Sequence, residues 1–396
     1  MGPAALMNSD ARISILARVL DLDGIDRRCS RRRHGGRLHS LRRRYSGALV
    51  FVGLSLAGSL ASANPGVEGG RNLALGGATR ASASGVSAFF INPAGMSVNR
   101  TLAAESNYQV AIERNTHAFG VAAVDSINNP RLALGLGYSS MIGLPRVGFE
   151  EVGDDGPREL RLYHRAHEVG LGISVLAIRR WLTIGVKFKY QNSSLRFFDS
   201  DRVRRDAQAT HHAFGLDVGA TLSIFGWVNL ALVGTNLSGP KAPAYTDSVG
   251  LDLKPFELIS GSFDAKRLPR ISDYPRTLGH GIAVFPLHND MLSLNFDGVY
   301  DLTSYASDNF VRKTYSGGSE YMLGKLALRL GGGWDSRGPL SDDDRGFVSA
   351  GLGVVKGAMP GKVGFIATLA FRRDLSGVLP ETYLGANIGL RFNPGY

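Results

Sequence analysis

Histidines and acidic residues occur in four groups whose residue types could bind a metal ion. The groups are His164, His167 and Glu168; His211 and His212; Asp154-Asp155-Gly156; and Asp342–Asp344. No His-Glu-x-x-His sequence accompanies the histidines, so exposed histidines beside a loop explain them better. The acidic groups could attract divalent ions, but solvated loop tips account for them better. The sequence therefore predicts no metal site.

Signals for nucleotide binding and for nucleophilic catalysis are also weak. The glycine-rich stretch Gly351–Gly357 lies inside a predicted strand, has the wrong spacing for a phosphate-binding loop and lacks a following helix. A hydrolase embedded in a sheet would place a serine, a histidine and an acid together on neighbouring strands. No such trio stands out, so we predict a protein that is not an enzyme and carries no cofactor.

The positive charge of the chain is concentrated before the predicted mature protein. The chain has 45 Lys plus Arg against 34 Asp plus Glu, a net charge of +11. Residues 1–63 hold 11 arginines and 4 acidic residues, which leaves a net charge of only +4 for the rest. A broad basic surface for nucleic acid is therefore not indicated. The single cysteine excludes a disulfide framework.

Residues 1–63 have the order of a secretory signal peptide. An arginine-rich stretch, Arg27–Arg44, precedes an apolar run, Gly47–Leu60, which is followed by Ala61-Ser62-Ala63. We predict cleavage after Ala63, and an over-extended start, because the part before the apolar run is long for a signal peptide. A single-span anchor is the alternative, but the run is short and rich in glycine and serine.

The rest of the chain is dominated by a period of two, which is typical of strands whose two faces differ. In one stretch the apolar residues Leu182, Ile184, Val186, Phe188 and Tyr190 alternate with Thr183, Gly185, Lys187, Lys189 and Gln191. Fourteen such runs occur: 101–112, 116–125, 131–140, 165–178, 181–192, 208–224, 226–237, 276–285, 290–302, 312–322, 325–335, 346–357, 362–373 and 382–392. Their usual length is sufficient to cross a bilayer at a tilt.

Two further observations favour a closed transmembrane barrel over a soluble sandwich. None of the 16 prolines lies inside a predicted run, as expected when every strand donates its amides to neighbours. Links after even-numbered runs are short, whereas most links after odd-numbered runs are long. Outer-membrane barrels have short periplasmic turns and long external loops. Residues 101–396 are thus predicted to form an all-β, antiparallel outer-membrane barrel of about 14 strands, with both chain termini in the periplasm.

Aromatic residues occur near the predicted strand ends, where amphipathic rings would meet the membrane interface. Trp181 and Trp227 begin strands at the predicted periplasmic end. Tyr138, Tyr190, Tyr300 and Trp334 lie toward the predicted outer end. General aromatic enrichment in sheets is the alternative explanation for any one of them.

Asn64–Arg100 lies outside the strand pattern and carries the clearest motif. It contains Arg71–Ala78, RNLALGGA, and Phe89–Met96, FFINPAGM. With these residues the sequence resembles the FadL-type outer-membrane transporter superfamily, including its PorV-type relatives, whose N-terminal segment carries a glycine-rich stretch and an Asn-Pro-Ala-Gly motif. Asn229–Gly239 and Tyr274–Ala283 are similar to mid-barrel strands of these relatives.

The resemblance implies that residues 64–100 form a hatch inside the barrel and that hydrophobic substrates leave through an opening in its wall. Asn92, Pro93, Ala94 and Gly95 would be the hatch motif. A barrel of this size leaves an interior that wall side chains alone cannot fill, which makes a plug physically reasonable. The alternative is that the motif only forms a turn before the first strand, for which Asn and Pro are well suited.

The predicted interior is polar and charge-balanced rather than a greasy tunnel. Its lumen-facing residues are predicted to be Glu105, Asn107, Gln109, Lys187, Lys189, Asp217, Asn295, Asp297, Glu320 and Arg329. We expect these charges to pair with each other or with the hatch rather than to bind substrate.

Two functions follow from the resemblance. The first is a channel for passive movement of small hydrophobic molecules, such as long-chain fatty acids, across the outer membrane. The second is a PorV-like accessory protein of a secretion or surface-attachment machinery, with contacts carried by the predicted outer loops Ser193–Ala207 and Ser238–Pro275. Expected partners are outer-membrane lipid, hydrophobic small molecules and the outer-membrane assembly machinery, but not nucleic acid.

Overall fold

The computed structural model describes residues 67, 69–113, 115–127, 129, 131–143, 149–153, 156–179, 181–199, 205–238, 274–287, 291–302, 311–336, 344–357, 362–376 and 380–393. They all belong to one compact unit of the chain. The predicted signal peptide, residues 1–63, lies outside the described residues and stays a prediction.

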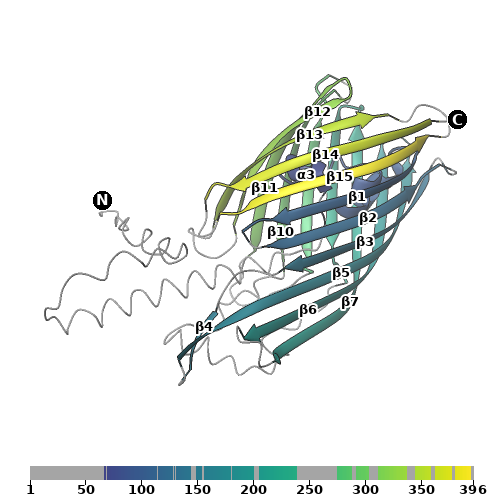
Figure 1. The fold of residues 1–396 in the computed structure, drawn as a ribbon. Coiled ribbons are helices and arrows are strands. Elements are labelled where there is room, and N and C mark those ends of the chain that lie inside the picture. Colours follow the sequence, from purple (N-terminus) through teal and green to yellow (C-terminus); the bar gives the residue numbers. More distant parts are fainter. Residues whose placement is uncertain are drawn as a thin grey trace, which may run out of the picture. The chain divides into compact units, whose positions relative to one another are not determined.

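The described chain is dominated by antiparallel strands (Figure 1). The first half comprises β1 (Leu102–Ala111), β2 (Thr116–Asp125), β3 (Leu132–Gly143), β4 (Phe149–Gly153), β5 (Gly156–Ile178), β6 (Leu182–Asp199), β7 (Arg205–Ile224) and β8 (Val228–Thr235). The second half comprises β9 (Thr277–Val284), β10 (Leu292–Asp301), β11 (Arg312–Leu323), β12 (Leu326–Asp335), β13 (Arg345–Lys356), β14 (Lys362–Asp374) and β15 (Thr382–Asn393).

Fourteen of these strands form a closed barrel, which confirms the predicted fold class. β1 pairs with β15, with Leu102 opposite Phe392 and Ala111 opposite Tyr383. β3 pairs with β5, with Leu132 opposite Val175, and this pairing completes the ring. β4 pairs with β5 in a hairpin beyond the β3 register, so β4 is not a wall strand. Complete closure gives every wall strand two hydrogen-bonded neighbours and leaves no open edge.

The strands at one side of the barrel extend further than predicted. β5, β6 and β7 continue into segments predicted as loops, including Ser193–Asp199 on β6. β4 was not predicted, and Pro157 lies opposite Val152 in its hairpin with β5. The backbone of these extensions is paired between neighbouring strands. The remainder of the two predicted outer loops, residues 200–204 and 239–273, lies outside the described residues.

The two ends of the barrel differ in their links. At the end where β1 begins and β15 ends, neighbouring strands are joined by residues 126–131, 179–181, 225–227, 285–291, 324–325 and 357–361. We call this the short-turn end. The opposite end, the long-link end, carries the β4 hairpin and the links 236–276, 302–311, 336–344 and 375–381. Two links there, 112–115 and 200–204, are short; the first was expected to be short, whereas the second was predicted as part of a longer loop, Ser193–Ala207.

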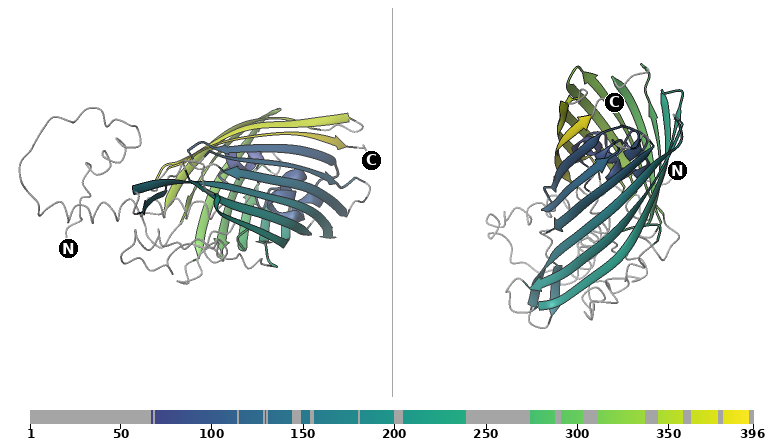
Figure 2. Two further views of the ribbon diagram at one scale, coloured as in Figure 1. Left: turned by 60° about the horizontal axis from the view of Figure 1, so that its bottom comes forward. Right: turned by 90° about the vertical axis from the view of Figure 1, so that its right-hand side faces the viewer.

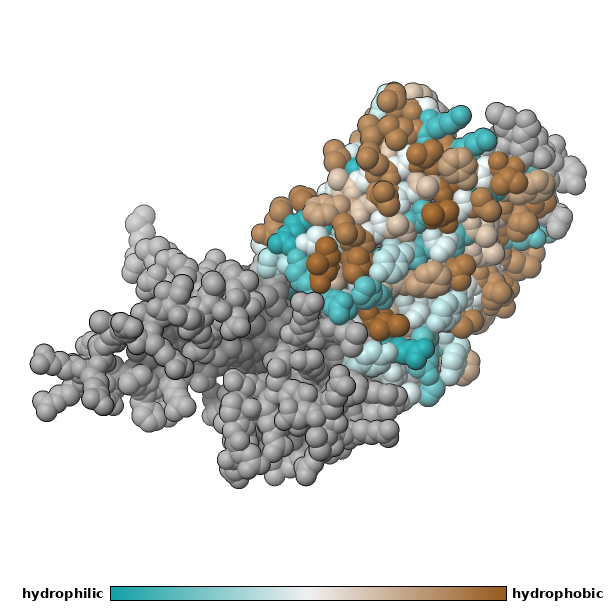
Figure 3. Space-filling view, viewed as in Figure 1, coloured by the Kyte–Doolittle hydropathy of each residue, from teal (hydrophilic) through white to brown (hydrophobic). Residues whose placement is uncertain are grey.

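The outer surface of the wall is apolar and the inner surface is small or polar. On β6, Ile184, Phe188 and Tyr190 are exposed, whereas Lys187 and Lys189 between them are buried. Figure 3 shows brown and pale side chains over most of the described wall. Such alternation is the pattern of strands with one face toward lipid and one toward the lumen. None of the described helices is long and apolar enough to cross a membrane.

Three short helices precede the barrel and lie within it (Figures 1 and 2). They are α3 (Gly69–Ala74), α4 (Val86–Ile91) and the 3-10 helix η1 (Pro93–Ser97). α3 contacts β12 to β15 and β1, whereas η1 contacts β3, β5, β6 and β7. We call residues 67 and 69–100 the N-terminal segment. Because its helices contact strands around the ring, it lies across the lumen rather than beside one wall.

Candidate channel lumen

The Asn-Pro-Ala-Gly motif connects the N-terminal segment to the barrel wall through Asn92. This residue is fully buried and caps η1, since its Oδ1 accepts a hydrogen bond from the Ala94 backbone N–H at 3.1 Å. Its Nδ2 donates to the Arg80 carbonyl at 2.8 Å and to Thr221 Oγ1 on β7 at 2.9 Å. Pro93 occupies the first turn of η1, where its missing N–H costs nothing. The motif therefore caps a helix and attaches it to the wall at once.

Glycines on the wall allow η1 to approach the strands closely. A Cβ atom at Gly185 on β6 would collide with the backbone of Pro93 and Ala94. At Gly219 on β7 it would collide with Asn92 Oδ1. The motif glycine, Gly95, is subject to the same limit, because a Cβ there would meet the Ala83 carbonyl. Part of the glycine excess in the sequence is thus explained by this backbone contact.

A third contact holds the end of η1 against β5. Ser97 Oγ and Ser174 Oγ lie 2.8 Å apart, and Ser174 Oγ donates to the Ala94 carbonyl at 2.8 Å. Ser97 and Ser174 are both buried. η1 is consequently hydrogen-bonded to two strands, β5 and β7, that are not neighbours in the sheet.

On the other side of the lumen, α3 is attached by an ion pair. Arg71 donates from Nε and Nη2 to the two carboxylate oxygens of Glu320 on β11, at 3.1 and 3.0 Å. Arg329 on β12 donates from Nε to Glu320 Oε2 and from Nη1 to Thr368 Oγ1 at 3.1 Å. Since Glu320 and Arg329 are buried, the three charges form a site in which loss of one partner is costly.

The connection between α3 and α4 is attached through Asp297 on β10. Asp297 Oδ2 accepts hydrogen bonds from the backbone N–H groups of Thr79 and Arg80, both at 2.9 Å. It also forms an ion pair with Arg80 Nη1 at 3.0 Å. A carboxylate that accepts hydrogen bonds from two backbone N–H groups and pairs with a guanidinium fixes the direction of the local chain and also balances the charge of Arg80.

Four charged side chains form a closed, neutral cluster on the inner face of β5, β6 and β7. Lys187 Nζ lies 3.1 Å from Glu168 and 3.2 Å from Asp217. Lys189 Nζ lies 3.4 Å from Glu168 and 2.9 Å from Asp217. All four are buried, and the Lys187 ammonium lies 5.1 Å from the ring centroid of Phe89 on α4. These charges pair within the wall, so no net charge faces α4.

The predicted polar residues of β1 lie near the start of the N-terminal segment. Glu105 and Asn107 are buried, and Glu105 Oε1 accepts a hydrogen bond from Asn387 Nδ2 on β15 at 3.0 Å. A Cβ at Gly69 would lie 2.7 Å from Asn107 Oδ1. Gln109, two residues further along the same strand face, is half-buried. On β10, buried Asn295 donates from Nδ2 to Ser293 Oγ at 3.1 Å.

One sector of the lumen is apolar instead. α4 and η1 pack against β1, β2 and β3 in a buried cluster. Its members are Ala83, Val86, Ala88, Phe89, Met96, Ala103, Ala122, Val124 and Ala133, with Phe90 and Ile91 packed against it. Phe89 and Phe90 meet edge to face, with ring centroids 5.3 Å apart. The wall side chains here are small, so the large side chains of this sector come from the N-terminal segment.

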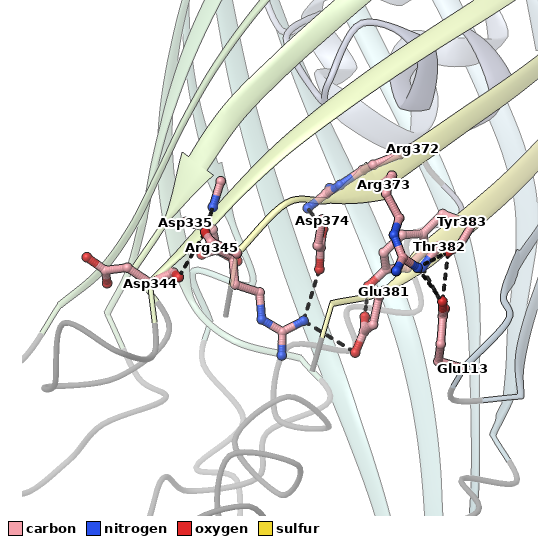
Figure 4. A network of polar contacts seen from close by, with 12 residues as sticks. Glu113, Asp335, Asp344, Arg345, Arg372, Arg373, Asp374, Glu381, Thr382 and Tyr383 are labelled. Atoms are coloured by element: carbon pink, nitrogen blue, oxygen red, sulfur yellow. Dashed lines mark hydrogen bonds and ion pairs between the residues drawn. The ribbon is translucent and has the colours of Figure 1, made fainter. Parts of the chain in front are cut away.

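A polar network at the long-link end joins the last three strands to the first hairpin (Figure 4). Arg345 Nη1 on β13 lies 3.0 Å from Asp374 Oδ2 and 3.4 Å from Glu381 Oε1. Glu113, in the link after β1, accepts from the Thr382 backbone N–H at 2.6 Å and pairs with Arg373 at 2.5 Å.

The contacts of Glu113 affect its protonation. Burial alone would raise its pKa, but the hydrogen bonds from Thr382 and Arg373 outweigh that effect and lower the pKa below its usual value. The Glu113 carboxylate is therefore part of the seam between β1 and β15.

Several residues that hold the N-terminal segment were not predicted from the sequence. Arg71, Arg80, Thr221 and Ser174 each contact a partner far away in the chain. Glu168 was interpreted as a possible metal ligand, although it continues the inward-facing alternation of β5. That alternation was the one signal in the sequence for the position of Glu168 on the inner face of the wall.

Some of the sites set aside from the sequence lie outside the described residues, namely Asp154, Asp155, Asp342 and Asp343. Among the described residues no group of three or more His, Cys, Asp or Glu side chains could hold a metal ion. The glycine-rich stretch at Gly351 lies within β13, paired with β12 and β14.

The fold is similar to that of solved channel structures over most of the chain. No protein-family model matches the chain, and no curated protein is similar to it in sequence. The monoaromatic hydrocarbon channel CymD superposes with a TM-score of 0.55 at 13% identity, covering 82% of this chain and 97% of that one.

Two further structures match over the same share of the chain. The toluene transporter TbuX of Ralstonia pickettii gives a TM-score of 0.53 at 14% identity, covering 82% of this chain and 98% of that one. A FadL homologue of Pseudomonas aeruginosa gives 0.50 at 14% identity, with 82% and 97% covered. The predicted resemblance is confirmed at the level of the fold: this chain has the fold of FadL-type outer-membrane channels.

Proposed function

We propose that this protein is an outer-membrane channel through which small hydrophobic molecules move passively. The observation that carries the proposal is the apolar sector between α4 and strands β1 to β3, in a lumen whose other sectors carry buried charges. An apolar solute would follow this sector because contact with apolar side chains does not separate ion pairs or polar groups from their partners. The described structural neighbours include a hydrocarbon channel and a toluene transporter, which supports the same class of solute.

The N-terminal segment acts as a hatch in this proposal. Arg71 and Arg80 attach it to the wall through ion pairs and Asn92 attaches it through a hydrogen bond, whereas α4 and η1 pack against β1, β2 and β3 in the apolar cluster. Limited displacement of α4 and η1 would open a path along β1 to β3 while Arg71 and Arg80 stay attached to β11 and β10. Passage then depends on a small rearrangement and needs no energy input.

The orientation follows from the links. In the proposal the long-link end faces outward and the short-turn end faces the periplasm, as in other outer-membrane barrels. β1 begins and β15 ends at the short-turn end, which would place both termini of the mature chain in the periplasm.

Uptake measurements in cells test the proposal. A strain lacking the gene should take up a labelled long-chain fatty acid and toluene more slowly than the parent, and the wild-type chain should restore the rate. Uptake of a small hydrophilic solute such as glycerol should not change and serves as the control. If deletion leaves uptake of both hydrophobic compounds unchanged, the proposed function is wrong.

A further inference from the structure

Tyrosine and histidine pairs lie on the outer surface of the wall toward the long-link end. The pairs are Tyr108 with His117, Tyr138 with His167, Tyr190 with His212, and Tyr300 with His280, and we call them the Tyr–His belt. Each pair joins two neighbouring strands, so the belt involves β1, β2, β3, β5, β6, β7, β9 and β10. Every histidine whose side chain the structure describes belongs to this belt.

Three of the pairs share one hydrogen bond. The tyrosine O–H and histidine Nδ1 lie 2.6 Å apart for Tyr108 and His117, and 2.7 Å apart for each of the other two pairs. When the tyrosine donates to Nδ1, the proton of the neutral imidazole must be on Nε2. Asn192 Nδ2, 3.0 Å from His212 Nδ1, favours the same tautomer. The tyrosine thereby leaves Nε2–H as the donor of the ring; in His117 it lies 3.2 Å from Asn115 Oδ1, so His167 and His212 are the histidines that the inference uses most directly.

The register places these histidines on the headgroup side of their tyrosines. His117 lies opposite Val110, two residues beyond Tyr108 toward the long-link end. The other two hydrogen-bonded pairs are arranged in the same way, because Ser140 lies opposite His167 and Asn192 lies opposite His212. His117 and His212 are exposed, and Tyr108 and Tyr190 are 44% and 41% exposed.

Basic residues occur on the same outer face at this level. Arg165 is exposed and precedes His167 by two residues on β5, which places it one step closer to the long-link end. Lys313 has the same relation to Tyr315 on β11, and the Tyr315 ring lies 6.2 Å from that of Tyr300. The surface therefore combines fixed Nε2–H donors with positive charges.

We propose that the Tyr–His belt binds the phosphate groups of anionic lipid headgroups in the leaflet that surrounds the long-link end. Phosphate oxygens accept hydrogen bonds from imidazole N–H and ammonium or guanidinium groups, and such charge-assisted bonds are the stronger ones. An ordinary interfacial belt needs only amphipathic rings. The short-turn end has such a belt in Trp181, Phe225 and Trp227, without a described histidine. The inference does not depend on what the lumen transports.

Native mass spectrometry of the full chain in detergent provides a test, with phosphatidic acid compared against phosphatidylcholine of the same acyl chains. The variant H117F/H167F/H212F keeps three rings and removes their N–H donors. We expect it to lose about fivefold in affinity for phosphatidic acid, the effect of about one net hydrogen bond. Its affinity for phosphatidylcholine should stay the same. R165Q/K313Q should show a loss of similar size.

Two further variants keep the test decisive. K325Q/K356Q removes two exposed positive charges at the short-turn end and should bind phosphatidic acid like the wild type. Y108F/Y138F/Y190F keeps the rings and the histidines but removes the tyrosine hydroxyls that fix the histidine proton on Nε2. Its affinity for phosphatidic acid should therefore fall between those of the wild type and the histidine variant. It replaces the histidine variant if that one does not fold. Equal binding by the belt variants and the wild type, or an equal loss in K325Q/K356Q, would overturn the proposal.

Discussion

Asn92 Nδ2 donates a hydrogen bond to Thr221 Oγ1 at 2.9 Å, and this bond joins residues that are 129 positions apart. It connects the Asn-Pro-Ala-Gly motif to the inner face of β7. Since Asn92 also caps η1 and bonds the Arg80 carbonyl, one side chain sets the helix start, the preceding turn and the wall contact. The motif is therefore both a turn and an anchor, and the two interpretations drawn from the sequence are compatible.

Removing the Thr221 hydroxyl should weaken this anchor. T221V keeps the shape of the side chain but leaves one buried Asn92 N–H without its wall acceptor, which should cost about 1–3 kcal/mol. Hydrogen exchange of the backbone amides at Ala94, Gly95 and Met96 should become faster in T221V, with little change in β10. T221S keeps the hydroxyl and should resemble the wild type. Equal exchange at these amides in T221V and the wild type would show that the bond does not hold η1.

Adding one methyl group to the wall should displace η1. A Cβ in G185A would collide with the backbone of Pro93 and Ala94, and such overpacking typically costs about 1–3 kcal/mol. We expect a lower thermal unfolding midpoint and faster uptake of hydrophobic solute, because η1 of the hatch would be displaced from its contact with β6. G357A is the matched control, since a Cβ there meets no atom within 4 Å. A G185A protein with the midpoint and uptake of G357A would contradict the close contact.

The Arg71–Glu320–Arg329 site should be sensitive to loss of its one acid. E320Q removes the carboxylate that both arginines contact, and breaking a buried ion pair costs about 3–5 kcal/mol. R373Q is the comparison, because the side chains of Arg373 and Glu113 are 40% and 39% exposed and such pairs contribute about 0–1 kcal/mol. Unfolding midpoints in the same detergent measure both. Similar shifts for the two variants would mean that the internal site contributes no more than the surface pair.

Strand periodicity predicted the barrel because the membrane imposes it. An apolar outer face and a polar inner face alternate along Leu182–Gln191, and the strand follows from that pattern alone. Beyond the membrane the constraint ends, so the continuation of β6 through Ser193–Asp199 was predicted as a loop. β4 was missed because its five residues, FEEVG, do not alternate between apolar and polar positions.

The polar contacts of the lumen were only partly predictable. The alternation of inward-facing and outward-facing residues indicates that Lys187 and Asp217 are buried, and the structure has both buried. It does not give the strand register that brings Glu168 on β5 within ion-pair distance of Lys187. Arg71 and Arg80 could be noticed as cations in a segment that precedes a lumen with several acidic residues. Their choice of Glu320 and Asp297 depends on where α3 lies, which no local pattern specifies.

Acid should weaken the seam between β1 and β15. The pKa of Glu113 is lower in the folded protein than in the unfolded chain, so its contribution to stability is complete above the unfolded pKa and is lost as pH falls through the folded pKa. The difference in unfolding midpoint between the wild type and E113Q should be largest near neutral pH and should shrink as the pH falls below the ordinary glutamate pKa of about 4.3. A difference that stays constant from neutral to acidic pH would show that the carboxylate charge does not stabilise the seam.

The movement of η1 away from the wall is the central step of the proposed channel, and a reversible cross-link tests it most directly. Ser97 Oγ and Ser174 Oγ are 2.8 Å apart, so S97C/S174C in a C29S background brings two thiols together between η1 and β5. Uptake of labelled toluene by cells carrying this variant should stop after oxidation and return after reduction, whereas S97C alone should not respond. Equal uptake by the oxidised and reduced double variant, with the cross-link verified, would contradict the account.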